Sequence, residues 1–161
     1  MRIVYIGGGF VGTCSAAAAA DSGHVVCVYD IDVEKMRLLG SGDHEAIMSC
    51  LFEQGLSDLL IRHRERIAFT SELTVLQESL EDAEAIVMCL PTPEIGETGA
   101  SDMRFYESAA HDVARLLVQR QSGKQESYVV IVNKSTVPID MVDHTEQLFS
   151  AEGVINFGVV S

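Results

Sequence analysis

Short apolar runs alternate along the chain with longer segments in which apolar residues recur at helical spacing. The runs are rich in Val and Ile, which is typical of strands buried on both faces of a sheet. They cover 2–6, 25–29, 66–69, 85–90, 128–132 and 154–160. This alternation predicts an α/β fold: a doubly wound, mostly parallel sheet with helices on both faces.

The segments between these runs carry the expected helices. Short helices are predicted over 33–39 and 72–80, and a further helix over 139–151. Apolar residues keep a helical spacing from Glu45 to Arg62, so we expect a single helix there in spite of Gly55.

The longest predicted helix follows Asp102, a suitable N-cap residue, and ends near Arg120. We expect its apolar residues to form one buried face. They are Phe105, Ala109, Val113 and Leu116. A loop over 94–101 precedes this helix, and a polar turn at 122–126 follows it.

A glycine-rich turn joins the first strand to a helix of small residues. Gly7-Gly8-Gly9-Phe10-Val11-Gly12 has the G-x-G-x-x-G spacing of a dinucleotide-binding turn. Gly7 allows the chain to turn sharply, Gly9 lets a pyrophosphate approach the backbone, and Gly12 lets the helix pack close to the sheet. The helix end supplies unpaired N–H groups and a partial positive charge for the phosphates.

The second strand ends at Asp30, where a carboxylate can accept hydrogen bonds from both hydroxyls of an adenosine ribose. The carboxylate would also repel a 2′-phosphate, since two unit charges ~4 Å apart interact by up to ~4 kcal/mol at an effective dielectric constant of ~20. Asp32 adds negative charge, and no Arg directly follows Asp30. The sequence therefore predicts NAD rather than NADP as the cofactor.

Two proline-containing loops follow later strands, Leu90-Pro91-Thr92-Pro93 and Asn133-Lys134-Ser135-Thr136-Val137-Pro138. Ligands of open α/β sheets bind beyond the carboxyl ends of the strands. Thr92 and Thr136 are therefore candidates for hydrogen bonds to a cofactor or an ordered water. Position alone supports equally well a second interpretation, in which both hydroxyls only cap strand-ending turns.

Composition narrows the functional classes further. The chain has 161 residues, which suits one domain, and its net charge of −13 disfavours binding to nucleic acid or anionic membranes. No apolar stretch is long enough to span a membrane, and no signal peptide precedes the first strand, so we expect a cytoplasmic protein. Four cysteines without a C-x-x-C pair suggest reduced thiols, and five scattered histidines predict no metal site.

These motifs together resemble the N-terminal domain of the UDP-glucose/GDP-mannose dehydrogenase family. The resemblance covers essentially the whole chain, in family order and spacing. It rests on Gly7 to Gly12, Asp30, Lys35, Phe52-Glu53-Gln54-Gly55-Leu56, Leu90-Pro91-Thr92-Pro93, Asp102 and Lys134-Ser135-Thr136-Val137-Pro138.

The resemblance implies an NAD-dependent oxidation of a sugar nucleotide, in which a primary alcohol becomes a carboxylate and two NAD are reduced. Val11, beside Phe10 in the glycine turn, would contact the pyrophosphate through its backbone. Lys35 would lie beside Asp30 at the ribose.

The same resemblance places Thr92 and Thr136 at the nicotinamide, with Thr136 also positioning a catalytic water. Ser135, in the same motif, is a further candidate cofactor residue.

The resemblance also implies that residues 1–161 are the NAD-binding domain alone. Family members continue into a central helix and a second domain, which hold the nucleophilic cysteine, the catalytic lysine and most of the sugar-nucleotide site. We therefore expect a homo-oligomer at full length and no sugar oxidation by this chain alone, with Cys89 a poor substitute for the nucleophile.

UDP-glucose is the expected substrate because it is the family's commonest. Alternative interpretations are an NAD-dependent hydroxyacid or hydroxyacyl-CoA type dehydrogenase domain, and a non-enzymatic NAD-sensing module.

Overall fold

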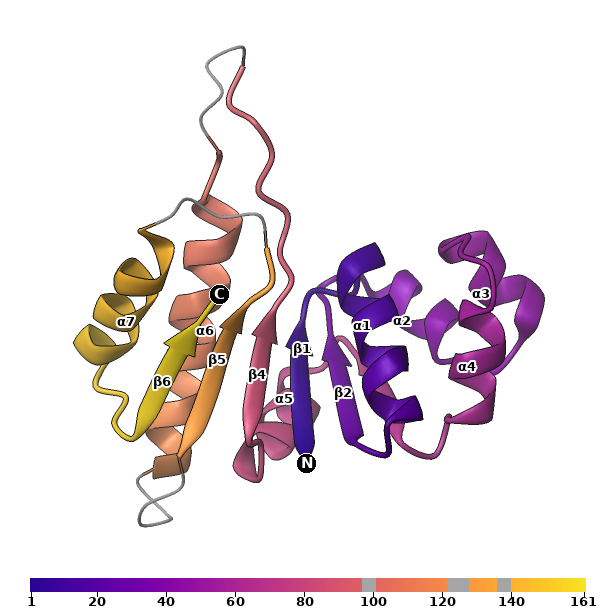
Figure 1. Ribbon diagram of the computed structural model, residues 1–161, viewed down its shortest axis with the longest axis horizontal. Coiled ribbons are helices and arrows are strands. Elements are labelled where there is room, and N and C mark those ends of the chain that lie inside the picture. Colours follow the sequence, from indigo (N-terminus) through magenta and orange to yellow (C-terminus); the bar gives the residue numbers. More distant parts are fainter. Residues whose placement is uncertain (97–100, 122–127, 136–139) are drawn as a thin grey trace.

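A computed structural model describes residues 1–96, 101–121, 128–135 and 140–161. The described residues form a six-stranded sheet in the order β3-β2-β1-β4-β5-β6, and every neighbouring pair is parallel (Figure 1). The strands are β1 (Arg2–Ile6), β2 (Val25–Tyr29), β3 (Ile67–Thr70), β4 (Ala85–Met88), β5 (Val129–Asn133) and β6 (Phe157–Val160). This order confirms the predicted doubly wound sheet and places its switch point between β1 and β4.

Helices cover both faces of the sheet. They are α1 (Phe10–Asp21), α2 (Val33–Leu39), α3 (His44–Cys50), α4 (Leu56–Arg62), α5 (Leu73–Glu81), α6 (Arg104–Gln121) and α7 (Met141–Glu152). In Figure 1, α1 to α4 lie over the half of the sheet that holds β1 and β2, while α6 and α7 lie with β4, β5 and β6. Among the helices described, none combines the length and apolar character needed to cross a bilayer.

The sheet separates two hydrophobic cores, and β1 contributes to both. Val4 belongs to the core that includes Tyr106 of α6, whereas Ile3 and Tyr5 belong to the core that includes Ala16 of α1. Successive strand residues point to opposite faces, so a strand covered on both sides needs apolar residues throughout. This requirement explains why the strands could be recognised as continuous apolar runs.

The prediction of one helix from Glu45 to Arg62 was wrong. The structure has two helices, α3 and α4, and Gly55 stands between them with φ of +81°, in the left-handed region that a right-handed helix excludes. The helical spacing persists because both helices bury apolar residues in the same core, Ile47 from α3 and Leu60 from α4.

The predicted start and buried face of α6 also need correction. The helix begins at Arg104, one residue later than an N-cap at Asp102 would imply, although Asp102 Oδ1 still caps the helix end by accepting from Arg104 N at 3.1 Å. Of the predicted face, Val113 is buried and Ala109 and Leu116 are partly buried against the core, whereas Phe105 is 52% exposed. The buried residues are Tyr106, Ala110, Val113, Ala114 and Leu117.

Smaller differences concern the ends of strands. Strand β4 ends at Met88, so Cys89 and Leu90, which were predicted within the strand, begin the following loop. Strand β6 covers only the last four residues of the predicted run 154–160. The predicted polar turn at 122–126 lies outside the described residues, as does part of the predicted loop at 94–101.

Candidate functional site

The segments singled out by sequence meet at one edge of the sheet. The glycine turn follows β1, Asp30 follows β2, the Leu90–Pro93 loop follows β4, and Lys134 follows β5. Because parallel strands end at the same edge, all four segments lie at the carboxyl side of the sheet, on both sides of the switch point (Figure 1).

The glycine turn is held against the neighbouring strand ends. Gly7 has φ of +107°, its N–H donates to Tyr29 O at 2.8 Å, and a Cβ on it would lie 2.3 Å from Cys89 O. A Cβ on Gly12 would lie 2.0 Å from Gly7 O. Glycine is therefore needed at both positions by the packing of the turn itself.

Gly9 lies at the open side of the same turn. Its φ is −73°, and a Cβ built on it would meet no atom within 4 Å. It is the N-cap residue of α1, where no side chain caps the helix and no acidic residue stands in the first turn. Phe10 and Val11 are about half exposed there. The turn thus offers free space and helix N–H donors to an anionic group.

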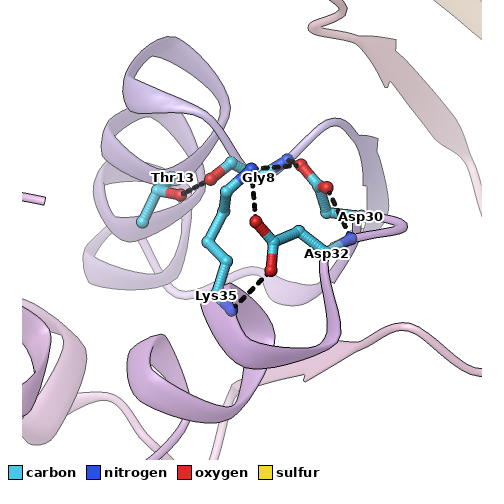
Figure 2. Close-up of polar contacts among 5 residues, drawn as sticks. All are labelled: Gly8, Thr13, Asp30, Asp32 and Lys35. Carbon is cyan, nitrogen blue, oxygen red and sulfur yellow. Dashed lines mark hydrogen bonds and ion pairs between the residues drawn. The ribbon is translucent and has the colours of Figure 1, made fainter. Parts of the chain in front are cut away.

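Asp30 points from the end of β2 into the glycine turn (Figure 2). Its Oδ2 accepts hydrogen bonds from Gly8 N at 2.7 Å and from Lys35 Nζ at 3.2 Å. Its Oδ1 accepts a third bond, from Asp32 N at 3.0 Å. The Asp30 side chain is only 14% exposed, so these contacts fix the orientation of the carboxylate.

Lys35 reaches Asp30 from the first turn of α2. Asp32 caps that helix by accepting from Lys35 N at 3.0 Å, and the Lys35 ammonium lies 4.0 Å from Asp32 Oδ2. An ionised carboxylate offers about four acceptor positions, and three at Asp30 are already used. A ribose that donates from both of its hydroxyls to this carboxylate would therefore share an acceptor position with one of these three donors or displace it.

Gly8 contacts the candidate site through Asp30, and the motif did not identify it, since it occupies a variable position of G-x-G-x-x-G. A Cβ on Gly8 would lie 2.3 Å from the end of the Met36 side chain and 3.3 Å from Asp30 Cβ. Thr13 supports the same residue by donating from Oγ1 to Gly8 O at 3.1 Å. No local pattern could reveal these contacts, because they depend on how α1 and α2 pack against the turn.

The structure describes the loop after β4 at Thr92, but the loop after β5 only as far as Ser135. Thr92 is half-buried in the loop after β4, and Thr136 lies outside the described residues, so their predicted roles stay predictions. Ser135 is half-buried and its hydroxyl bonds to the β4 end: it accepts from Leu90 N at 2.8 Å and donates to Met88 O at 3.2 Å.

The cysteines offer no activated thiolate at this edge. All four are free thiols. Cys89 lies directly beside the glycine turn, because a Cβ built on Gly12 would be 3.2 Å from the Cβ of Cys89. Burial raises the pKa of Cys89 to about 11, against the opposing effect of Lys134, so the group stays a thiol at neutral pH. In the parts of the chain that the structure describes, no three His, Cys, Asp or Glu side chains are grouped as metal ligands.

Comparison with known proteins identifies the family of the chain. The model of the UDP-glucose/GDP-mannose dehydrogenase family, NAD binding domain, matches residues 1–161. UDP-glucose 6-dehydrogenase TuaD of Bacillus subtilis is 30% identical over 164 aligned positions, which cover 99% of this chain and 32% of that protein.

Solved structures of nucleotide-sugar dehydrogenases share the fold of this chain. The UDP-glucose dehydrogenase of Pyrobaculum islandicum superimposes with a TM-score of 0.80 at 26% identity, over 98% of this chain and 34% of its own. The GDP-mannose dehydrogenase of Pseudomonas aeruginosa shares the fold, with a TM-score of 0.81 at 24% identity, over 99% of this chain and 35% of its own. The chain thus spans about a third of the length of these relatives. It belongs to the UDP-glucose/GDP-mannose dehydrogenase family, as an NAD-binding domain.

Proposed function

We propose that this chain binds NAD across the carboxyl edge of its sheet and serves as the cofactor half of a nucleotide-sugar 6-dehydrogenase. The observation that carries the proposal is the Asp30 carboxylate, oriented by Gly8 N and Lys35 beside an open helix end. That arrangement has room for a pyrophosphate at Gly9 and acceptors for a ribose one strand away.

Each residue at this edge has a proposed task. The N–H groups at Phe10, Val11 and Gly12 bind the pyrophosphate, and Gly7 and Gly9 let it approach. Asp30 and Lys35 hold the adenosine ribose. The other half of the dinucleotide then extends across the switch point toward β4 and β5, because the two mononucleotide halves lie on opposite sides of it.

Thr92 and Thr136 are proposed at the nicotinamide, where NAD accepts a hydride when bound, and Thr136 as the residue that positions a water. The relatives named for UDP-glucose support that sugar nucleotide as the substrate. Oxidation of its primary alcohol to a carboxylate removes four electrons as two hydrides, which requires two NAD and one water.

The remaining parts of the reaction are proposed to lie beyond this chain. The relatives are about three times as long, which supports a central helix and a second domain that hold the nucleophile and the sugar nucleotide. We further propose a homo-oligomer at full length. Four free cysteines fit the reducing cytoplasm as its location.

Titration calorimetry with NAD tests the proposal on the 161-residue chain. We expect the wild type to bind NAD and Asp30→Ala to bind at least ten-fold more weakly, which corresponds to ~1.4 kcal/mol of lost binding free energy. Asp21→Ala is the matched control, because Asp21 is exposed at the far end of α1 and pairs with His63 at 2.8 Å. Wild-type protein that does not bind NAD, or Asp30→Ala that binds it normally, would refute the proposed site.

A further inference from the structure

We infer that Ser135 is a positioning residue, which fixes the Leu90–Pro93 loop at the nicotinamide half of the proposed site by joining the end of β5 to the segment that follows β4. The inference rests on the proposed function. It differs from a direct role in cofactor binding, because it assigns the Ser135 hydroxyl to the protein backbone rather than to a ligand.

The hydrogen bonds of the hydroxyl carry the argument. A serine hydroxyl has one hydrogen to donate, and Ser135 donates it to Met88 O at 3.2 Å. The same oxygen accepts from Leu90 N at 2.8 Å. A direct hydrogen bond donated to a cofactor would therefore break the bond to Met88.

The contact stands where regular strand pairing stops. The register of β4 and β5 ends with Met88 opposite Asn133. Lys134 N and Ser135 N both donate to Met88 O at 3.0 Å, so the β5 end folds over this single carbonyl. The Ser135 side chain then takes the place of a strand residue as the partner of Leu90 N.

A buried polar cluster fixes the same segment from the other side. Asn133 Oδ1 accepts from the hydroxyl of Tyr106 in α6, and Asn133 Nδ2 donates to Thr145 Oγ1 of α7 at 3.3 Å. Tyr106 and Thr145 also bond to each other at 2.8 Å, and neither has solvent-exposed surface. Ser135 therefore extends from an anchored strand end, and its hydroxyl transmits that anchoring to the loop after β4.

This geometry has a functional consequence. Leu90 lies two residues before Thr92, and Ser135 directly precedes Thr136. The contact therefore stands at the base of the Leu90–Pro93 loop, on the β4 side of the switch point and away from Asp30. Loss of it should impair the nicotinamide end of the site while the adenosine end stays intact.

The test compares NAD with ADP-ribose, which has the same pyrophosphate and both riboses but no nicotinamide. For Ser135→Ala we expect NAD to bind about five-fold more weakly and ADP-ribose to bind unchanged, as measured by calorimetry. Hydrogen exchange of the Leu90 amide should accelerate in the same variant, while the Cys89 amide, bonded to Ile6 O at 2.8 Å, keeps its protection. A role in stability alone would not separate the two ligands.

Three further variants complete the design. Ser49→Ala is the matched control, because that hydroxyl bonds only within α3, to Ala46 O at 2.7 Å. Ser135→Thr retains the hydroxyl and should restore the NAD affinity. If Ser135→Ala does not fold, Ser135→Cys replaces it, since a thiol keeps the shape and bonds weakly, and the same selective loss is expected.

The outcomes are distinct. Equal weakening of both ligands, no weakening of either, or unchanged Leu90 exchange would overturn the positioning role while leaving the proposed NAD site in place. Wild-type protein that binds neither NAD nor ADP-ribose would refute the proposed function, and the positioning role with it.

Discussion

One added methyl group should have different effects at two glycines of the same turn: a loss of stability at Gly12 and a loss of NAD affinity at Gly9. Gly12→Ala places a Cβ 2.0 Å from Gly7 O and 3.2 Å from Cys89 Cβ, so backbone atoms must move. Overpacking of this kind costs ~1–3 kcal/mol, and a backbone clash belongs at or above the upper end of that range. The higher helix propensity of alanine offsets ~1 kcal/mol of this loss in the free energy of unfolding. We expect a net loss of ~2 kcal/mol, which lowers the Tm of a domain of this size by ~4–8 °C.

Gly9→Ala should leave stability nearly unchanged and weaken NAD binding. Its φ of −73° suits any residue, and the added Cβ meets no atom within 4 Å. The entropic gain from replacing glycine and the small loss at an N-cap position are each within ~1 kcal/mol and oppose one another, so the Tm should move by less than ~2 °C. The methyl group occupies the space proposed for the pyrophosphate, so the Kd for NAD should rise at least ten-fold, or ~1.4 kcal/mol.

Thermal unfolding by circular dichroism and NAD calorimetry on the same samples measure the two effects. Gly42→Ala is the control: at φ of +71° and with open space around its Cβ, it should lose stability through backbone strain without changing NAD affinity. The reasoning fails if Gly9→Ala binds NAD like the wild type, or if Gly12→Ala is as stable as the wild type.

Three further predictions follow from charges on the protein. Asp30→Asn should reduce the preference for NAD over NADP about ten-fold, whereas Lys35→Met should increase it, because each removes one of two opposite charges 3.2 Å apart at the ribose site; paired titrations with both cofactors measure the ratio, and equal shifts in both variants would contradict the assignment. The hydrogen-bonded Arg104 guanidinium lowers the pKa of Asp102 to about 2. Asp102 therefore contributes stability that is complete above the ordinary carboxyl pKa of ~4 and is lost as the pH falls toward 2. The difference in free energy of unfolding between the wild type and Asp102→Asn should shrink over that interval. A difference that stays constant would exclude the ion pair as its source. Iodoacetamide should label Cys89 slowly at pH 8 and faster only as the pH approaches 11, since burial raises its pKa to about 11; mass mapping at several pH values checks this, and rapid labelling at pH 8 would contradict it.

Local chemistry made part of this structure predictable. The glycine turn and Asp30 lie within one strand-helix-strand unit, where each residue's requirement follows from its neighbours in sequence. The apolar runs likewise predicted the strands, since burial on both faces leaves few polar positions. Gly55 was misjudged for the opposite reason: the spacing of apolar residues is the same whether one helix or two bury them in a common core.

Contacts between segments that are far apart in the chain could not be predicted from the sequence. The bond from Ser135 to Leu90 depends on the register of β4 and β5, which joins residues 45 positions apart. The buried face of α6 depends on which side of the helix meets the sheet, and two faces one residue apart both have helical spacing. The Lys35 ammonium at Asp30 was expected from the family resemblance, but only the three-dimensional structure shows that it shares Oδ2 of that carboxylate with Gly8 N.

The acidity of the chain is compatible with an anionic cofactor because the relevant electrostatics are local. Exposed charges are largely screened beyond a Debye length of ~8–10 Å, so a net charge of −13 spread over the surface would have little effect on two phosphates bound at the proposed site. Nearby, the uncapped N-terminus of α1 contributes partial positive charge, and Lys35 offsets Asp30. A nucleic acid would need many basic contacts along its backbone, whereas a dinucleotide needs only this one site. A net negative charge is therefore compatible with membership in an NAD-binding domain family.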